Sequence, residues 1–392
     1  MGTVDVRPDT KLPPASVVSV SSPPPGTVWP SESQELLLVA ALADGSAAVD
    51  AWEDVRPRLS IDELELGSFA LLPLIYRNLG AAGHDDVDLP RLKGIYRRTW
   101  VKNNLLVERT KAAAGALLES GIRAEFVEGV VLASRFYSEL GLRPTSFVDV
   151  LVDERDLSGA LTTVARAGWT ENPALAPSRG VRYVFDRDGN ACILRTVLAA
   201  DSTRPAHARP LAFLWDSREQ HSLGGVAIPV PPPTETLLAS CVFHTRVDSR
   251  QNLQWIVDAK MLLPAGIDWD RLFALARENG QISRVRDALG LLARLPGSRP
   301  PREVCDRFLA APVSRRERLT YLCTVGAIRG PGSLPVLVGE HVAATADRSA
   351  LAVVATFPGF LRDRWDLART WHVPFAAGTR AVRRLRDRRG AA

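Results

Sequence analysis

The sequence predicts an α+β protein in which a small mixed sheet with packed helices is flanked by helical regions at both ends. Helical periodicity dominates residues 31–120, shorter strand-like and helical runs alternate from 121 to 230, and helical periodicity returns after the proline-rich stretch at 229–233. We expect five parts: a disordered leader over 1–30, a helical region over 31–120, an α/β core over 121–230, a helical domain over 231–378 and a basic tail over 379–392.

The amino-terminal elements follow from composition and capping signals. Residues 1–30 combine Pro, Ser, Val and Gly without periodicity, which favours disorder. Ser31 and Gln34 have capping-box spacing before an apolar run, so a helix is expected to begin there. Helical patterning continues around 71–79 and from about 92 to 120, where Gly121 provides a stop.

The central elements are shorter and change period. Strands are expected over 123–127 and 148–152, and helices over 130–139 and 156–167. A hairpin is expected from two further strands, 182–185 and 191–198, which flank the turn sequence Asp188-Gly189-Asn190. The carboxy-terminal region is expected to form helices over 235–244, 253–263, 269–278, 283–295 and 315–328.

Composition excludes several classes of protein. The chain has 392 residues, of which 46% are hydrophobic, and no apolar run approaches the roughly 18 residues needed to cross a bilayer. The first residues lack the basic start and apolar run of a secretion signal, so we expect a cytoplasmic protein without a membrane partner. Four widely separated cysteines are expected to be buried free thiols rather than a zinc or disulfide site: Cys192, Cys241, Cys305 and Cys323.

The net charge of +5 comes from the end of the chain. Between Arg380 and Arg389 there are six arginines and one aspartate, so the rest of the chain is formally neutral. A short basic segment without interleaved aromatics is typical of a solvated helix end. We therefore expect no nucleic-acid partner, except through this Arg380–Arg389 tail.

The segment from Phe126 to Val152 carries the most informative pattern. It is expected to run from strand to helix, through an Arg-Pro loop, and into a second strand. It resembles a bacterial nucleotidyltransferase-like family whose pattern is Lys-Gly, a helix with a Tyr, Gly-Leu-Arg-Pro, and a strand with Asp-x-Asp. The matching residues are Gly129, Tyr137, Gly141, Leu142, Arg143, Pro144 and Asp149. Further similarity around Cys241–His244, Gln254–Leu263 and Ile267–Trp269 extends the resemblance over roughly 33–300.

The resemblance implies a DNA polymerase β-type fold and a two-metal mechanism. Carboxylates at i and i+2 of one strand project to the same face, and a third acid comes from a neighbouring strand. Together they hold two divalent ions that orient the attacking hydroxyl and neutralise the triphosphate. Magnesium prefers such hard oxygen ligands.

This sequence departs from the family pattern where metal and phosphate would bind. Phe147 stands at the first acid of the pair, and Glu128 stands at the lysine. In the stretch Cys192-Ile-Leu-Arg195, Ile193 stands at the third acid and Arg195 at the family's His. A metal ion would thus lack two of its three protein ligands. At position 128 a negative charge, which repels phosphate, stands in place of the positive charge of the lysine.

Asp149 remains the candidate catalytic residue and metal ligand. The alternative is a carboxylate on the exposed side of an alternating strand. Arg143 is either an anion-binding residue or a loop-tethering arginine paired with Asp149 or Glu128. His244 and Asp258 are expected to orient each other across two helices, either as a buried pair or in substrate binding. The candidate substrate-binding residues are therefore Glu128, Gly129, Arg143, His244 and Asp258.

Three functional hypotheses follow, of which the third is an RNA-binding protein that uses the Arg380–Arg389 tail. The first is a nucleotidyltransferase-like protein that has lost metal-dependent catalysis and serves as a binding or accessory subunit, with a nucleotide or a biosynthetic enzyme as partner and no cofactor. The second is an active transferase of nucleotidyl or phosphoryl groups to a small molecule or peptide. It would use Mg²⁺, Asp149 and a further acid, for which the candidates are Glu128, Asp153 and Asp186.

Overall fold

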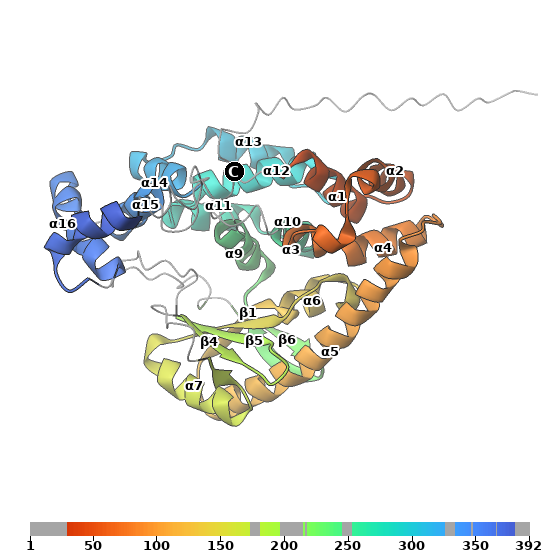
Figure 1. Cartoon of the computed structure of the whole chain (residues 1–392), viewed down its shortest axis with the longest axis horizontal. Coiled ribbons are helices and arrows are strands. Elements are labelled where there is room, and N and C mark those ends of the chain that lie inside the picture. Colours follow the sequence, from red (N-terminus) through yellow and green to blue (C-terminus); the bar gives the residue numbers. More distant parts are fainter. Residues whose placement is uncertain are drawn as a thin grey trace, which may run out of the picture.

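The structure is a computed structural model that describes residues 30–172, 181–196, 215, 218–244, 253–325, 334–345, 348–365 and 367–380. Figure 1 shows a small sheet with helices on both of its sides and a long helix that runs from the sheet to the amino-terminal helices. The predicted leader, apart from Pro30, and the tail beyond 380 lie outside the described residues.

The amino-terminal region is helical, as the sequence predicts. The predicted capping box is confirmed, because the Gln34 backbone N–H donates to the Ser31 hydroxyl and Gln34 Oε1 accepts from the Ser31 backbone N–H. Gly121 follows the last helix with φ +69°, the left-handed conformation expected of a glycine stop. The elements are α1 (Glu32–Leu42), α2 (Ser46–Val55), η1 (Arg56–Arg58), η2 (Ile61–Glu63), α3 (Leu66–Phe69), α4 (Leu72–Ala81) and α5 (Leu89–Glu119).

The central sheet has five strands in the order β1-β2-β5-β4-β3. Strands β2 and β5 are parallel, whereas the other neighbours are antiparallel, so the predicted mixed sheet is confirmed. Its strands are β1 (Ala124–Gly129), β2 (Phe147–Val152), β3 (Thr170–Glu171), β4 (Val181–Phe185) and β5 (Ala191–Arg195), and its connections include α6 (Val130–Phe136), η3 (Leu140–Leu142), η4 (Glu154–Asp156) and α7 (Leu157–Arg166).

The two faces of the sheet are packed differently. Helices α5 and α7 cover one face, where alternate side chains such as Val150, Cys192 and Leu194 are fully buried. On the other face, alternate residues of β4 and β5 such as Tyr183 and Ile193 are only partly buried. Asp149 and Arg195 lie on this second face, by the strict alternation of strand side chains.

A two-stranded hairpin, β6 (Glu219–Leu223) and β7 (Val226–Val230), packs beside β1 and was not predicted. Its first strand, Glu-Gln-His-Ser-Leu, is polar and lacks apolar alternation. The pair Gly224-Gly225, with φ +55° and +91°, is the turn signal that would have indicated it.

Helices follow the hairpin, and the predicted ones are confirmed within a few residues over the described range: α9 (Pro233–His244), α10 (Gln254–Leu262), α11 (Trp269–Glu278), α12 (Ile282–Arg294) and α14 (Arg315–Val325). The elements η6 (Leu263–Ala265), α13 (Arg302–Ala310), α15 (Leu334–Ala344), α16 (Ala350–Arg364) and η7 (Thr370–His372) were not predicted. No helix in the described ranges is both long and apolar enough to cross a bilayer.

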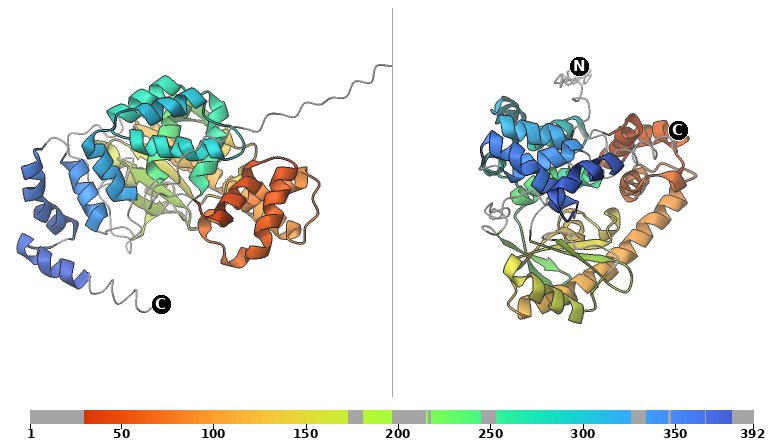
Figure 2. Two further views of the ribbon diagram at one scale, coloured as in Figure 1. Left: turned by 90° about the horizontal axis from the view of Figure 1, so that it is seen from above. Right: turned by 60° about the vertical axis from the view of Figure 1, so that its left-hand side comes forward.

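One hydrophobic core joins the helices before the sheet to helices that follow it, from α9 to α13. It contains Leu38 and Trp52 from the amino-terminal helices together with Trp255 and Leu289 from the carboxy-terminal helices. Figures 1 and 2 show α1 and α12 close together, although they are far apart in sequence. The helical regions before and after the sheet therefore share a core.

Candidate functional site

Three neighbouring strands bring the candidate acids together on one face of the sheet. In the strand register Glu128 of β1 lies opposite Asp149 of β2, which lies opposite Ile193 of β5. A register shift between Phe126 and Glu128 adds one residue to β1, and without it Val127 would face Asp149. Because residues directly opposite share a face, the bulge places two carboxylates beside each other.

Asp149 is buried, with 1% of its surface exposed, so the alternative that it lies on an exposed strand face is wrong. Its carboxylate receives two hydrogen bonds from Arg195, with Nε donating to Oδ1 over 2.5 Å and Nη2 donating to Oδ2. Such a bidentate ion pair satisfies both charges away from water. Arg195 comes from the adjacent parallel strand, two residues beyond Ile193.

The electrostatic surroundings hold Arg195 in its charged form. Burial lowers the pKa of this guanidinium, but the charges of Asp149 and Glu128 and the hydrogen bonds from Arg195 to Asp149 outweigh burial and raise the pKa above its ordinary value. Glu128, which is itself buried, is thus part of the same charge cluster. The cluster contains two carboxylates around one guanidinium.

Gly129 allows the end of β1 to pass against the start of β2. Its φ is +75°, and a Cβ built on it would lie 2.0 Å from the backbone oxygen of Phe147. Only glycine fits both the left-handed conformation and this close approach. The glycine of the sequence motif therefore has a packing role at the entrance of the site.

The Gly-Leu-Arg-Pro loop is held by the long helix α5. Asn103 donates from Nδ2 to the carbonyl oxygens of Leu140 and Arg143, at 2.6 and 2.8 Å. A Cβ at Gly141 would lie 2.4 Å from the ring of Tyr96, another α5 residue. These contacts fix the direction in which Arg143 leaves the loop.

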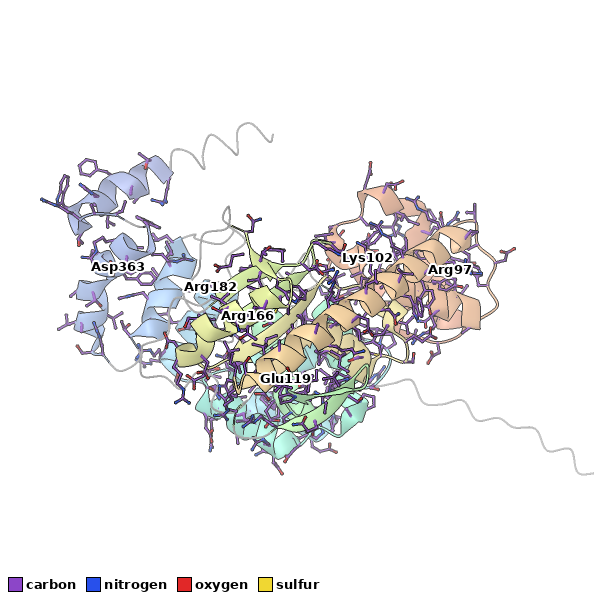
Figure 3. The ribbon with its side chains drawn as sticks, turned by 90° about the horizontal axis from the view of Figure 1, so that it is seen from below. Arg97, Lys102, Glu119, Arg166, Arg182 and Asp363 are labelled. Atoms are coloured by element: carbon purple, nitrogen blue, oxygen red, sulfur yellow. The ribbon has the colours of Figure 1, made fainter. Side chains whose placement is uncertain are left out.

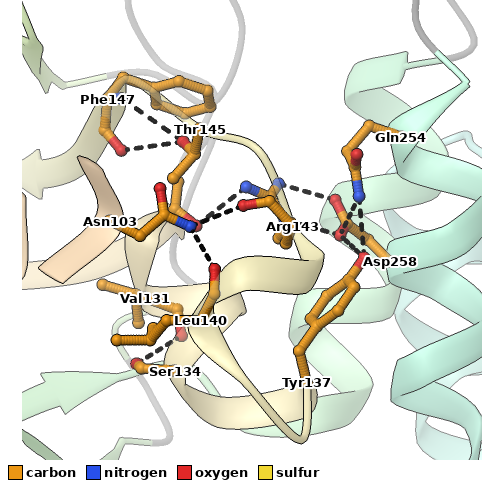
Figure 4. A network of polar contacts seen from close by, with 11 residues as sticks. Asn103, Val131, Ser134, Tyr137, Leu140, Arg143, Thr145, Phe147, Gln254 and Asp258 are labelled. Carbon is orange, nitrogen blue, oxygen red and sulfur yellow. Dashed lines mark hydrogen bonds and ion pairs between the residues drawn. The ribbon is translucent and has the colours of Figure 1, made fainter. Parts of the chain in front are cut away.

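Arg143 connects the sheet to the helical region. Its Nε and Nη2 donate to Oδ1 and Oδ2 of Asp258, at 2.7 and 2.8 Å, and its Nη1 donates to the Gly129 carbonyl oxygen at 3.0 Å (Figure 4). Both charged side chains are at most 4% exposed. Arg143 thus tethers the loop to α10, and the carboxylate that receives its guanidinium is Asp258 rather than Asp149 or Glu128, the two named as examples. Its role in anion binding stays a prediction.

Two further side chains complete the environment of Asp258. The Tyr137 hydroxyl donates to Asp258 Oδ1 at 2.6 Å, and Gln254 Nε2 donates to the same hydroxyl at 2.8 Å (Figure 4). Burial and the neighbouring Asp258 charge raise the pKa of Tyr137 well above its ordinary value. Tyr137, which also belongs to the hydrophobic core, thus has a polar role as well.

The predicted site residues are largely brought together in two adjoining clusters. Glu128 and Asp149 lie with Arg195, and Gly129 and Asp258 lie with Arg143. The side chain of His244 lies outside the described residues, so its expected pairing with Asp258 stays a prediction. Arg195 and Tyr137 stand at positions of the sequence motif, but their partners were not predicted, and Gln254 was not predicted as a site residue.

The other acids considered for catalysis have local structural roles. The Asp153 carboxylate accepts from the Arg155 backbone N–H and caps η4. Asp186 accepts from the backbone N–H groups of Asp188 and Asn190, both at 2.9 Å, as in the turn that joins β4 and β5. Neither contact involves the Asp149 cluster.

The donor set does not fit a pair of magnesium ions. Phe147 and Ile193 supply no oxygen ligand, and both oxygens of Asp149 already accept from Arg195. In the part of the chain that the structure describes, no three His, Cys, Asp or Glu side chains converge as metal ligands. Cys192 and Cys241 are buried free thiols, while Cys305 and Cys323 are partly exposed.

A small mixed sheet, a buried aspartate on its second strand and a neighbouring helical module are the features of a nucleotidyltransferase-like protein. A family model described as "Uncharacterised nucleotidyltransferase" matches residues 69–297, more than half of the chain, and the chain belongs to this family. A crystal structure of an antigenic nucleotidyltransferase-like protein from Paracoccidioides brasiliensis is also similar, with 16% identity, a TM-score of 0.33, and coverage of 51% of this chain and 96% of that chain. No curated protein sequence matches significantly.

Proposed function

We propose that this protein is a nucleotidyltransferase-like protein without metal-dependent transfer, which acts as a binding or accessory subunit, for example beside a biosynthetic enzyme. The observation that carries the proposal is the ion pair between Arg195 and Asp149. A guanidinium bound to both carboxylate oxygens provides the positive charge that a divalent ion provides in the family mechanism.

The charge balance supports this proposal. Arg143 and Arg195 face three carboxylates, Glu128, Asp149 and Asp258, and both guanidinium groups form ion pairs within the cluster. A triphosphate entering the site would meet arginines that are already paired, with Glu128 where the family has a lysine. We therefore expect no cofactor and weak affinity for free nucleotides.

A second candidate is an active Mg²⁺-dependent transferase of nucleotidyl or phosphoryl groups to a small molecule or peptide. The observation that favours it is the position of Glu128, whose strand register sets it beside Asp149 on the same face. One or two carboxylates together with substrate phosphates can hold Mg²⁺, but Arg195 would first have to leave Asp149.

Isothermal titration with Mg²⁺ and each nucleoside triphosphate separates the two candidates. We expect no magnesium-dependent binding to the native chain, and we expect the triple variant Phe147→Asp, Ile193→Asp, Arg195→His to gain it. The matched control, Asp149→Asn with Arg195→Gln, removes both charges together and should behave like the native chain. Magnesium-dependent binding by the native chain that this control abolishes would favour the transferase instead.

A further inference from the structure

The outer side of helix α5 carries a concentration of positive charge. Residues 89–107 contain three arginines, two lysines and no acidic residue, a formal charge of +5. Arg91 forms an ion pair with Asp62. The other four basic side chains are exposed and have no ion-pair partner among the described residues: Lys93, Arg97, Arg98 and Lys102. Figure 3 shows Arg97 and Lys102 on this side of α5.

This charge pattern works against the stability of the helix itself. Lys93 and Arg97 are four residues apart, as are Arg98 and Lys102, so the two members of each pair are neighbours on the helix surface. Like charges at this spacing destabilise a helix, and the segment contains no acid that would offset them. A bound polyanion would relieve both repulsions.

Aromatic side chains accompany these cations. Trp100 is 47% exposed and follows Arg97 by three residues, so the two are neighbours on the helix surface. One turn before Trp100, the ring of Tyr96 packs against that of Tyr76 from α4 in a tilted arrangement, with centroids 5.4 Å apart, and both tyrosines are partly exposed. Basic and aromatic residues are thus interleaved here, which they are not in the Arg380–Arg389 tail.

A cavity of about 570 Å³ opens beside the aromatic pair. Tyr76 and Lys93 line it, together with the apolar residues Val87, Leu89 and Pro90. Two acids line it as well: Asp86 forms an ion pair with Arg56 at 3.3 Å, and Asp85 is exposed, where it can accept a hydrogen bond from the amino group of a base. The volume is within the range of small-molecule sites, so a nucleobase fits against Tyr76 with its phosphate near Lys93.

We propose that the outer side of α5, with its four unpaired cations and the rings of Tyr76, Tyr96 and Trp100, binds single-stranded nucleic acid. Bases stack on the aromatic rings and phosphates contact the cations, which is how proteins hold single strands without reading their sequence. An anionic bilayer would suit the exposed Val101 and Leu105 but would leave the cavity and the tyrosine pair uncovered. A second copy would bring one segment of charge +5 against another.

The expectation of no nucleic-acid partner outside the Arg380–Arg389 tail rested on the net charge, in which acids elsewhere in the chain cancel the charge of α5. Strand binding on α5 goes beyond the proposed function. It requires neither metal-dependent transfer nor its loss, since Asn103, which holds the Gly-Leu-Arg-Pro loop, is buried on the opposite side of the helix.

The test is fluorescence anisotropy of a labelled single strand of about 16 nucleotides, made as RNA and as DNA of the same sequence, titrated with the full chain. We expect binding that weakens with salt, with a slope of log affinity against log salt of about −3 if all four cations contact phosphate. The variant Arg97→Gln, Lys102→Gln should reduce the size of this slope by about 1.4. Trp100→Ala should weaken binding about tenfold and leave the slope unchanged. The strand that binds more tightly identifies RNA or DNA as the ligand.

Matched control variants change exposed residues elsewhere in the described structure. The variant Arg166→Gln, Arg277→Gln removes two exposed arginines from α7 and α11, and Trp371→Ala removes a tryptophan that is 60% exposed. Both control variants should bind the strands like the native chain.

Three results would overturn the proposal. The first is no binding of either strand by the native chain. The second is an equal loss of binding in the α5 variants and in their controls. The third is strand binding that the α5 variants leave unchanged, which would assign it to another segment of the chain. Flotation with phosphatidylglycerol vesicles that the α5 variants abolish, without strand binding, would assign this surface to a bilayer instead.

Discussion

Two arginines, Arg143 buried and Arg195 mostly buried, each bind a carboxylate from a separate segment of the chain. Arg195 holds Asp149 between parallel strands, and Arg143 holds Asp258 between the central loop and α10. Burying either charge alone would cost far more than burying the pair, because no water would replace the lost partner. The consequence is that single substitutions in these pairs act first on stability and only then on binding.

Asp258→Asn is expected to lower the free energy of unfolding by about 3–5 kcal/mol, because it leaves the Arg143 guanidinium buried without a counter-charge. Urea unfolding followed by circular dichroism measures this loss. The companion variant Tyr137→Phe removes one hydrogen bond to the same carboxylate and should cost only about 0.5–1.5 kcal/mol. Equal losses in the two variants would contradict the central role of the ion pair.

Glu125 provides a pH-dependent prediction. This β1 side chain is fully buried, and among the residues that the structure describes neither of its oxygens has a hydrogen-bond partner. Burial raises its pKa to about 8, against the lowering effect of Arg218 and Arg123 and with a further rise from Glu235. In the folded chain it therefore stays protonated at pH values where the unfolded chain has already ionised.

The pKa of Glu125 is higher in the folded chain than in the unfolded chain. Its contribution to the free energy of unfolding is therefore fully present below the unfolded pKa of 4.5 and is lost as the pH rises toward 8. The slope contributed by Glu125 is at most about 1.4 kcal/mol per pH unit. Glu125→Gln should flatten the pH dependence of the melting temperature over this range, whereas Glu63→Gln, at an exposed position, should leave it unchanged. A native-like slope in the Glu125 variant would exclude this assignment.

At the scale of elements, the passage of β1 over β2 depends on a glycine. Gly129→Ala would combine a left-handed backbone with a contact of 2.0 Å to a backbone oxygen, neither of which a side-chain movement relieves. We expect a loss of several kcal/mol or failure to fold, measured by yield and thermal melting. Gly168→Ala has a similar φ of +89° but open space around it, and should cost only about 1 kcal/mol. Comparable effects at both positions would show that strain alone, without the clash, sets the cost.

Local elements were predictable because their signals are local. Ser31 with Gln34, and Gly121, mark helix ends within a few residues of the groups they bond. The bulge that turns Glu128 toward Asp149 has no such signal, since Val127 and Glu128 fit the same strand pattern in either register. The sequence therefore predicted the strands but not which β1 side chain would face the site.

The sequence indicated which residues belong to the candidate site, but it did not indicate which of them bind each other. Asp149 and Arg195 are 46 residues apart, and Arg143 and Asp258 are 115 apart, so their contacts depend on strand order and helix packing. Motif matching identified the positions that depart from the family, including Arg195. Motif matching could not show that Arg195 donates to both carboxylate oxygens of Asp149.

At the scale of the whole molecule, the two helical regions should unfold together. Leu38 of α1 and Leu289 of α12 belong to one core, whereas Leu361 of α16 belongs to a separate small cluster. Leu38→Ala is expected to lower hydrogen-exchange protection in α4 and α12 by a similar amount, about 2–5 kcal/mol, and to leave α16 unchanged. Leu361→Ala should do the reverse. Loss of protection confined to the amino-terminal helices in the first variant would mean that the regions fold separately.

The pairing of Asp149 with Arg195 also affects how this family member can change over evolutionary time. A chain that replaced Arg195 first would carry a buried, uncompensated aspartate and would be selected against for its poor folding. A chain that gained an acid at position 193 first would have no metal site while the guanidinium remained on Asp149. A metal site at this position would thus require coupled changes, whereas Asp149 itself is retained for folding.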